Sequence, residues 1–498
     1  MVSDMVDVLV VGAGLAGLAA ALAATQQGAS VLVLERAPQE ERGGNTRFSN
    51  GAMRAVYAGV DDIVELVGDI TPEERARADF GSYTREQYYD DIGRVTQYRA
   101  DPMLSDILVE QSGPTMRWLK SQGVSYLPLY EWQFKLPDGR IKFSGGSAVE
   151  ARGGGDGISA ALFRTVEKAG IPVMYETTAV ALIDNGEGIC GVRVRQGRKL
   201  SDIMARTVVL AAGGFEASTE WRTKYLGPGW ELAKVRGSRF NTGDGLRMAL
   251  EAGAMPYGHW SGCHSASWDL NAPDVNTLEF GTVFKRDDFM HGLMINLNGE
   301  RFVDEGADVR AMTYARMGRA ILAQPGQIAW QVYDAQTSPL LHGEYRVRQS
   351  ARFRADTLEE LAGKMEGINQ AAFLATVDSF NRAVRRDIPF DPGKKDGRCT
   401  QGLAIPKSHW ATAIEQPPFE AYAVTCGITF TFGGVRIADS GQVMDVDDKP
   451  IPGLYAAGEM VGGVFYFNYP GGAGLMSAAV FGRLAGTSAA TAARLPPA

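Results

Sequence analysis

The order of apolar and polar segments at the N-terminus predicts a βαβ unit. Residues 7–11 are mainly apolar and β-branched, which is typical of a buried parallel strand. Residues 15–27 are rich in Ala and Leu, which have high helix propensity. Residues 30–35 read Ser-Val-Leu-Val-Leu-Glu and predict a second strand. Together the three segments have the length of a βαβ unit, about 30 residues.

The same patterns predict elements along the rest of the chain. Apolar runs predict strands at residues 171–180, 188–194, 207–214, 422–428 and 435–437. Amphipathic patterns predict helices within residues 71–122, around residues 314–322, 358–366 and 370–386, and at residues 474–485. The mixture of strands and helices favours the α/β fold class.

The composition of the chain changes near Ala254. From there to about Pro418 the sequence is richer in Trp, His, Arg and Asp. A chain of 498 residues is long enough for two or three domains. We therefore expect a Rossmann-like nucleotide-binding domain formed by residues 1–253 and 419–498, and an inserted α+β capping domain, for the substrate, formed by residues 254–418.

Charge and cysteine content exclude several classes of function. The net charge is −8 and no long basic run occurs, which argues against nucleic-acid binding. The four cysteines lie far apart, so the sequence predicts no zinc, c-type haem or iron–sulfur site and no disulfide. Apolar runs are broken by glycines and are too short to span a membrane. The first strand starts at Asp7, which leaves no room for a signal peptide, and we expect a cytoplasmic protein.

A glycine motif follows the first predicted strand. In Gly12-Ala-Gly14-Leu-Ala-Gly17, the first glycine allows a tight turn and the second lets the backbone approach a phosphate. The third lets the helix pack closely on the strand, and the helix N-terminus points N–H groups at the phosphates. Glu35 ends the second strand, where a carboxylate would accept hydrogen bonds from ribose hydroxyls. The alternative is a glycine turn with a purely structural role.

Further glycine clusters follow other predicted strands. Residues 42–51, Arg-Gly-Gly-Asn-Thr-Arg-Phe-Ser-Asn-Gly, form a loop of small residues suited to phosphate and ring contacts, or else an ordinary surface loop. Residues 211–214 and 241–245 contain glycine turns that would be unremarkable singly. The C-terminal loop 453–459 reads Gly-Leu-Tyr-Ala-Ala-Gly-Glu. A nicotinamide-binding domain needs only the N-terminal motif, whereas a flavin buried across a whole domain needs both ends, so we expect FAD.

This order of motifs resembles the FAD-dependent fumarate reductase/succinate dehydrogenase flavoprotein superfamily over essentially the whole chain. Relatives with covalent flavin carry a histidine in the loop after the first βαβ unit, and no histidine precedes His259 here. The resemblance therefore implies non-covalent FAD. It assigns cofactor contacts to Gly12, Gly14, Leu15, Ala16, Gly17, Glu35, Arg36, Gly43, Gly44, Asn45, Thr46, Ser49, Asn50, Gly51, Val180, Ala212, Gly213, Asp244, Gly458, Glu459, Gly472, Gly474, Leu475 and Ser477.

The resemblance also implies catalytic residues in the inserted segment. The fumarate-reducing members have a carboxylate-binding histidine at the place of His264. They have an Arg-Phe-x-Asn-Glu motif followed by a proton-donating arginine. Residues 301–305 and Arg310 correspond to these, and Arg310 lies one residue further along the chain than the usual spacing. Tyr314 is a second candidate acid or base. A structural histidine and a salt-bridged surface arginine are the alternative interpretations.

Two substrate-binding motifs depart from the fumarate reductases. Those enzymes have His-x-x-Gly-Gly and Asn-Arg-x-Gly-Gly near the flavin, whereas this chain has Phe430-Thr-Phe-Gly-Gly and Asn468-Tyr-Pro-Gly-Gly. Simple fumarate reduction is therefore not expected. The Tyr469-Pro form is similar to ketosteroid dehydrogenases, in which this tyrosine polarises a ketone.

The set of motifs most resembles tricarballylate dehydrogenases. That resemblance implies desaturation of tricarballylate to cis-aconitate, with proton abstraction and hydride transfer to flavin N5. Arginine stays protonated at neutral pH, so Arg310 would need a nearby acid such as Asp304, Glu305 or Asp308. Arg286 or Arg239 would hold a remote carboxylate.

Two other reactions stay open at this stage. The same residues would serve a soluble ene-reductase, which runs the reaction in reverse, and a ketosteroid-type desaturase is the third candidate. A flavoprotein used mainly for electron transfer or docking would not need His264, Arg310 and Tyr469. We expect a small carboxylate substrate and, as electron acceptor, a quinone or a partner redox protein.

Overall fold

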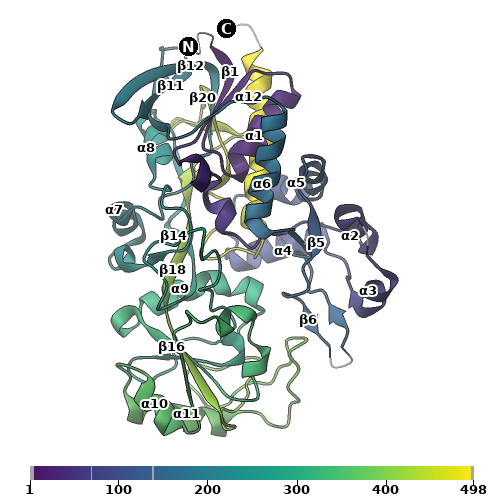
Figure 1. Ribbon diagram of the computed structural model, residues 1–498, viewed down its shortest axis with the longest axis vertical. Helices are drawn as coiled ribbons and strands as arrows, with labels where there is room; N and C mark the ends of the chain where they lie inside the picture. The colour runs from purple at the N-terminus through teal and green to yellow at the C-terminus, as the bar shows by residue number, and fades with distance from the viewer. Residues whose placement is uncertain (1–4, 69, 137–138, 495–498) are drawn as a thin grey trace.

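In the computed structural model the chain is elongated, with both termini at one end and the segment around residues 290–415 at the other (Figure 1). The structure describes residues 5–68, 70–136 and 139–494. It confirms the predicted α/β fold class.

A parallel sheet forms the core of the end that carries the termini. Its parallel strands are β1 (Val6–Val11), β2 (Val31–Leu34), β9 (Val173–Met174), β12 (Lys199–Leu210) and β20 (Pro450–Ala456). They are arranged in the order β9-β2-β1-β12-β20. An antiparallel extension is formed by β10 (Thr178–Asp184), β11 (Ile189–Gln196) and β19 (Gln442–Met444). The carboxyl ends of the parallel strands meet at one edge, so the loops after β1, β2, β12 and β20 lie together there.

The strand expected at residues 171–180 is two short strands in the structure. The backbone turns between them at Glu176, which has φ of 51°. β9 therefore ends at Met174 and pairs with β2, whereas β10 starts at Thr178 and pairs with β11. The turn places residues 177–179 beside the loop after β2, where the Thr177 N–H donates to the Glu35 carbonyl over 2.9 Å.

Three helices pack on the parallel sheet: α1 (Leu15–Gln26), α6 (Gly154–Lys168) and α12 (Ala473–Ala493). α1 and α12 approach closely through small residues. A Cβ at Gly482 would lie 2.4 Å from the Ala16 carbonyl oxygen, and one at Gly486 would lie 2.1 Å from that of Ala20. α12 runs beyond the predicted end at residue 485, because its Ala-rich tail favours helix and packs into the core.

A side lobe is formed by residues 52–151. Its helices are α2 (Val60–Val67), α3 (Pro72–Arg77), α4 (Arg85–Val95) and α5 (Pro102–Ser121). Its short strands are β3 (Ala52–Met53), β4 (Ala78–Asp79), β5 (Tyr126–Pro128), β6 (Phe134–Lys135), β7 (Ile141–Lys142) and β8 (Val149–Ala151). The helices predicted within residues 71–122 have Thr71, Thr84 and Asp101 as their N-caps. The side chains of these residues accept hydrogen bonds from backbone N–H groups of the first turn.

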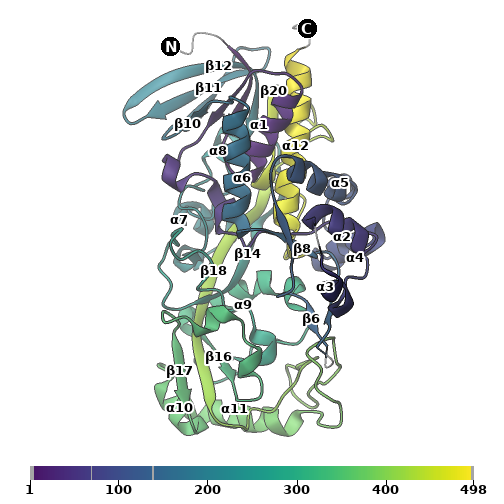
Figure 2. The same ribbon diagram turned by 45° about the vertical axis from the view of Figure 1, so that its right-hand side comes forward.

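A second sheet runs from the middle of the molecule to the end opposite the termini (Figure 2). Its strands are β13 (Lys234–Val235), β14 (Pro256–Asp269), β15 (Leu293–Asn296), β16 (Ala329–Tyr333), β17 (Arg352–Ala355) and β18 (Phe419–Val435). The accompanying helices are α7 (Thr219–Trp221), α8 (Asp244–Glu251), α9 (Met317–Leu322), α10 (Leu358–Lys364) and α11 (Gln370–Ala383).

β18 replaces two predicted strands. It is one strand of 17 residues that ends at Val435, so the separate strand expected at residues 435–437 is wrong. β14 was not predicted, because its 14 residues are mostly small and polar and show no clear alternation. β14 pairs with β18 in antiparallel register and carries His264 into the centre of the molecule. A separate apolar core under this sheet includes Trp330, Phe373 and Phe380.

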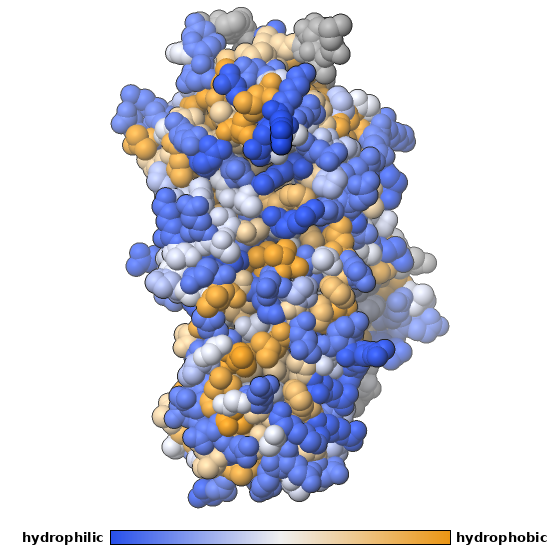
Figure 3. Space-filling view, turned by 60° about the vertical axis from the view of Figure 1, so that its left-hand side comes forward, coloured by the Kyte–Doolittle hydropathy of each residue, from blue (hydrophilic) through white to orange (hydrophobic). Residues whose placement is uncertain are grey.

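Within the described ranges, no helix has the length and apolarity needed to cross a membrane. Figure 3 shows apolar side chains in separate groups between charged ones on one face. All four cysteines are free.

Gly17 tests the close packing of α1 on β1. A Cβ on Gly17 would lie 1.9 Å from the Gly12 carbonyl oxygen. We expect Gly17→Ala to lower the free energy of unfolding by about 2 kcal/mol or more and to release bound flavin on gel filtration. Gly363→Ala in α10 is the matched control, because nothing lies within 4 Å of its Cβ position. A Gly17→Ala protein as stable and as yellow as the control would contradict this packing.

Candidate active site

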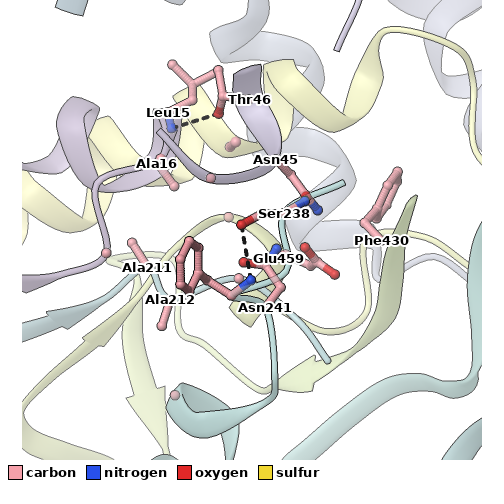
Figure 4. Close-up of a pocket in the computed structure, with 18 of the residues that line it drawn as sticks. Leu15, Ala16, Asn45, Thr46, Ala211, Ala212, Ser238, Asn241, Phe430 and Glu459 are labelled. Atoms are coloured by element: carbon pink, nitrogen blue, oxygen red, sulfur yellow. Dashed lines mark hydrogen bonds between the residues drawn. The ribbon is translucent and has the colours of Figure 1, made fainter. Parts of the chain in front are cut away.

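A cleft lies at the edge of the sheet where the parallel strands end (Figure 4). Leu15, Ala16 and Thr46 form one wall, Ala211 and Asn241 lie opposite, and Phe430 stands at one end. The cleft contains about 1590 Å³ of empty space, including the part open to solvent. The predicted cofactor residues that line it are Gly12, Gly14, Leu15, Ala16, Glu35, Arg36, Gly44, Asn45, Thr46, Ser49, Ala212, Gly213, Asp244, Gly458, Glu459, Gly474, Leu475 and Ser477.

The N-terminus of α1 points into this cleft. Gly14 is its N-cap and has no side chain that could accept from the first turn, which carries no acid. The Leu15 N–H donates to Thr46 Oγ1 over 3.0 Å. Gly12 has φ of 103°, and a Cβ there would lie 2.3 Å from the Ala211 carbonyl oxygen. This helix end therefore presents backbone N–H groups and a positive dipole to an anion such as a pyrophosphate.

Glu35 is fixed at the neighbouring strand end. Its carboxylate accepts from the Ala13 N–H over 3.0 Å and from the Ala37 N–H over 2.8 Å. Burial raises the pKa of Glu35, although the backbone N–H bonds favour the ionised form. Next to it, Arg36 pairs with Asp244 over 2.8 Å. This arrangement suits a ribose and the adjoining nucleotide.

Two buried carboxyl groups lie under the other end of the cleft. Glu459 accepts from the Thr431 N–H over 2.6 Å and from Thr431 Oγ1 over 3.0 Å. Glu216 accepts from the side-chain amides of Asn45 and Asn241, both over 2.6 Å. Burial raises the pKa of both acids, and that of Glu459 is raised further by Glu216. The sequence analysis missed Glu216, whose only signal is an acid directly after a Gly-Gly-Phe turn.

The remaining predicted cofactor residues lie around the cleft rather than in its lining. Gly17 packs against Gly12, and Gly43 supports the loop from behind with φ of 106°. Val180 is outside the lining, which residues 177–179 provide instead, and its carbonyl accepts from Arg247 over 3.0 Å. Asn50, Gly51 and Gly472 line a second cavity.

The second cavity continues from the first at Ser49, Thr429, Tyr469 and Leu475, which line both. It contains about 660 Å³ of empty space. Its walls come from the side lobe and from the segment carried by the second sheet. The polar and aromatic lining includes Trp132, Arg236, His264, Lys285, Asp287, Arg310 and Tyr314.

His264 lies at the centre of this second cavity. Its ring stacks on Phe430 with centroids 5.2 Å apart and contacts the edges of Tyr314 and Tyr469 at 5.0 and 5.2 Å. The residue is only 3 % exposed, and neither ring nitrogen has a hydrogen-bond partner within the described protein. Burial and then the nearby Arg236 charge hold the pKa of His264 well below its ordinary value. His264 is therefore a neutral imidazole, able to donate or accept one hydrogen bond.

Two tyrosines face each other beside His264. The hydroxyls of Tyr314 and Tyr469 are in direct contact. Burial raises the pKa of both phenols, so they are neutral hydrogen-bond donors at neutral pH. Arg310 and Tyr314 lie in two separate 3₁₀ turns, Arg310–Met312 and Tyr314–Arg316, which both border the cavity.

Two guanidinium groups supply positive charge with unused donors. Arg310 lies 4.9 Å from the Trp132 ring centroid, and its Nη1 and Nη2 are buried without a hydrogen-bond partner in the described residues. Nε and Nη1 of Arg236 are also buried without a hydrogen-bond partner in the described residues. The Arg236 guanidinium lies 4.6 Å from the Trp268 ring centroid. Sequence analysis missed Arg236, because nothing distinguishes it from its neighbours in the run of residues 234–239. The third cation of the cavity, Lys285, pairs with Glu344 over 2.9 Å.

The arginines proposed from sequence as carboxylate clamps lie elsewhere. Arg286 is fully buried and pairs with Asp269 over 2.8 Å. Arg239 is exposed and pairs with Glu41 over 2.7 Å. Neither lines the second cavity.

The acids proposed as partners of Arg310 are also engaged elsewhere. Asp304 accepts from Ser408, Glu305 pairs with Arg301, and Asp308 pairs with Arg94. The acid nearest to Arg310 is Asp288, whose Oδ1 lies 3.8 Å from its Nη1. Asp287 lines the cavity itself, and burial raises its pKa.

Comparison with known proteins shows similarity along the whole chain. The family described as "FAD binding domain" matches residues 7–475. The chain is 31 % identical to "Probable fumarate reductase Ifc3" of Shewanella frigidimarina over 98 % of this chain and 75 % of that protein. It is 27 % identical to "3-oxosteroid 1-dehydrogenase" of Mycolicibacterium smegmatis over 99 % of both. An open flavocytochrome c3 fumarate reductase structure matches with a TM-score of 0.73 at 29 % identity, over 99 % of this chain and 79 % of that one.

The buried neutral histidine predicts a dependence of stability on pH. His264 is unprotonated when folded but takes up a proton near pH 6.5 when unfolded, so the unfolded state gains stability as the pH falls below about 6.5. Uptake of this one proton lowers the free energy of unfolding by about 1.4 kcal/mol per pH unit.

We expect the free energy of unfolding, measured with urea on the FAD-saturated protein between pH 6.5 and 5, to contain this contribution. In His264→Gln the slope should be smaller by about 1 kcal/mol per pH unit, whereas Gly363→Ala should keep it. Equal slopes in His264→Gln and the wild-type protein would show that the imidazole is protonated in the folded state.

Proposed function

The chain belongs to the FAD binding domain family, and from this premise we propose that it desaturates a C–C bond next to a carboxylate, most specifically that of tricarballylate to give cis-aconitate. The chain is an FAD-dependent oxidoreductase that acts on C–C bonds.

The cleft residues fit FAD. The uncapped start of α1 suits the pyrophosphate, and Glu35 suits the ribose. The loop after β2 and the start of α12 border the place where the two cavities meet, which suits the ring. No histidine lines the described cleft, consistent with the expected non-covalent attachment. When bound, the flavin supplies the hydride acceptor or donor.

The proposed substrate is inferred from the N–H groups of Arg236 and Arg310 that have no hydrogen-bond partner in the described residues. A buried guanidinium with unpaired N–H groups is costly, and a carboxylate is the ligand that satisfies it best, through charge-assisted bonds. Two such groups suit a substrate with at least two carboxylates. Arg236 also compensates for the cationic side chains that are replaced by Phe430 and Tyr469 in the C-terminal motifs.

The residues of the second cavity can divide the chemistry. Arg310 is placed to exchange the proton at the carbon next to a carboxylate, while Arg236 holds a remote carboxylate. His264, Tyr314 and Tyr469 are neutral donors that can bond to an enolate-like oxygen. Trp132 and Phe430 limit access of water to the reacting atoms.

One observation favours a second candidate, a ketosteroid-type desaturase. The Tyr314–Tyr469 hydroxyl pair lies where it could polarise a ketone, and one relative is named as a 3-oxosteroid dehydrogenase. A steroid pocket would be largely apolar, whereas this cavity contains unpaired guanidinium groups. We therefore prefer a carboxylate substrate.

The reverse direction, an ene-reductase, uses the same residues. The electron partner that fixes the direction is, in our proposal, a quinone or a partner redox protein. We further propose that the protein works in the cytoplasm, where its four free cysteines stay reduced.

Anaerobic mixing of the flavin-loaded protein with a substrate panel tests this function. We expect tricarballylate to bleach the flavin absorbance, because two guanidinium groups fit its carboxylates, and we expect little bleaching by monocarboxylates or 3-ketosteroids. Bleaching by a 3-ketosteroid alone would favour the second candidate and remove the first.

Variants of the two arginines test their separate roles. Arg310→Ala should slow bleaching by about a thousandfold while the protein stays yellow, because the proton-exchanging group is lost. Arg236→Met should weaken substrate binding by about a hundredfold with a smaller effect on the saturated rate.

Arg239→Ala is the matched control, because Arg239 is exposed and lies outside the cavity. It should match the wild-type protein in both measurements. Undiminished bleaching in Arg310→Ala would remove this residue from the chemistry.

A further inference from the structure

We propose that His342 is the solvent-side end of a proton path that passes through Asp288 to Arg310. The proposal rests on the function above, because it concerns how the proton exchanged at the substrate reaches solvent. A guanidinium that exchanges a proton at carbon needs such a path, since its free-base form is very unfavourable at neutral pH.

The contacts between these three side chains are continuous. Asp288 Oδ1 lies 3.8 Å from Arg310 Nη1 on one side and 2.6 Å from His342 Nδ1 on the other. The His342 backbone N–H also donates to Asp288 Oδ2 over 2.7 Å, which fixes the carboxylate. The distance of 3.8 Å is longer than a hydrogen bond, so the proposed path requires Arg310 to move toward Asp288, and Nη1 and Nη2 of Arg310 have no hydrogen-bond partner among the described residues.

Asp288 has the charge state that such a path requires. The residue is 2 % exposed, and burial by itself raises the pKa of its carboxyl group. The bond to His342 and the Arg310 charge outweigh burial and hold that pKa below its usual range. Asp288 is therefore an ionised acceptor between two possible proton donors.

The neighbouring Asp287 offers no such route. It lines the cavity, but its buried Oδ1 has no hydrogen-bond partner in the described part of the chain. Asp288, in contrast, is bonded to a histidine that reaches the surface.

His342 is placed at the boundary with solvent. Its side chain is 26 % exposed, and its Nε2 lies 3.2 Å from the Glu131 carbonyl oxygen of the side lobe. Both ring nitrogens thus face oxygen acceptors, so an imidazolium can donate to both. The charged and titratable groups around it are Asp288, His291, Lys285, Arg310 and Glu344 of the second-sheet segment and Glu131 of the lobe.

In the reductive direction, Arg310 gives a proton from Nη1 to the substrate carbon as the C–H bond forms. Asp288 then passes a proton from His342 Nδ1 to Arg310, and His342 regains one from water. A bound flavin would supply the hydride for the adjacent carbon. Each proton that Arg310 gives up is replaced from solvent through Asp288 and His342. Desaturation runs the same transfers in reverse, and the proton leaves through His342.

The test is single-turnover flavin bleaching by tricarballylate in His342→Ala, with and without added imidazole. We expect the rate to fall about tenfold to a hundredfold, the solvent isotope effect to rise, and imidazole to restore much of the rate. Binding of citrate as a non-reactive carboxylate, measured by the shift of flavin absorbance, should stay as in the wild-type protein, because His342 does not line the cavity.

His409→Ala is the matched control, since His409 lies next to Asp396, away from both cavities. It should leave the rate, the isotope effect and the imidazole response unchanged. A His342→Ala protein with the wild-type rate and isotope effect would overturn the proton path while leaving the function intact. So would a slower variant that imidazole does not restore and that binds citrate more weakly, because the role would then be structural. A wild-type protein that no carboxylate bleaches would overturn the proposed function, and the path with it.

Discussion

The parallel register of β1, β12 and β20 brings three distant chain segments to one edge of a sheet. β1 pairs with β12 at Val11 and Leu210, and β12 pairs with β20 at Leu210 and Ala456. The loops that follow these strands therefore meet, although Val11 and Leu210 are 199 positions apart and Leu210 and Ala456 are 246 positions apart. The close packing of α12 on α1 then holds the C-terminal loop against the N-terminal helix. The cleft that fits FAD exists only because both constraints are satisfied together.

The electrostatics of the second cavity follow from how deeply each group is buried. His264, Tyr314 and Tyr469 are kept neutral, because charging any of them in this environment is costly. The guanidinium groups of Arg236 and Arg310 provide the positive field of the cavity. In the proposed function these charges hold a substrate anion and the neutral donors bond to it, and the proton that Arg310 exchanges must reach solvent through groups outside the cavity. Asp288 and His342 are the bonded pair adjacent to that field.

The sequence predicted the fold class and most local elements because these depend on short-range patterns. The turn at Gly12 and the helix after it are specified by residues within a few positions of each other. β14 and the single long β18 were missed because their pairing is determined by contacts between residues more than 150 positions apart. For the same reason Arg236 and Asp288 could not be identified: each is an ordinary charged residue until the fold places it beside Trp268 or His342. Arg286 and Arg239 showed the converse, since their residue type fitted the chemistry but their location did not.

The replacement of cationic side chains in the C-terminal motifs bears on the choice between an acid and a ketone as substrate. Phe430, which lines the first cleft, and Tyr469, which lines both cavities, make the region where the cavities meet aromatic, which taken alone would suit a steroid. An apolar ligand, however, would leave the N–H groups of Arg236 and Arg310 buried and unpaired, at a cost of several kcal/mol. Such a ligand would gain only apolar contacts, and His264 and Phe430 already make an apolar contact of this kind by stacking on each other. An acid satisfies the guanidinium groups and still leaves the tyrosine hydroxyls free to bond to its developing enolate oxygen. In our proposal the positive charge of the cavity comes from Arg236, in the turn after β13, and from Arg310, and it holds a carboxylate rather than a neutral substrate.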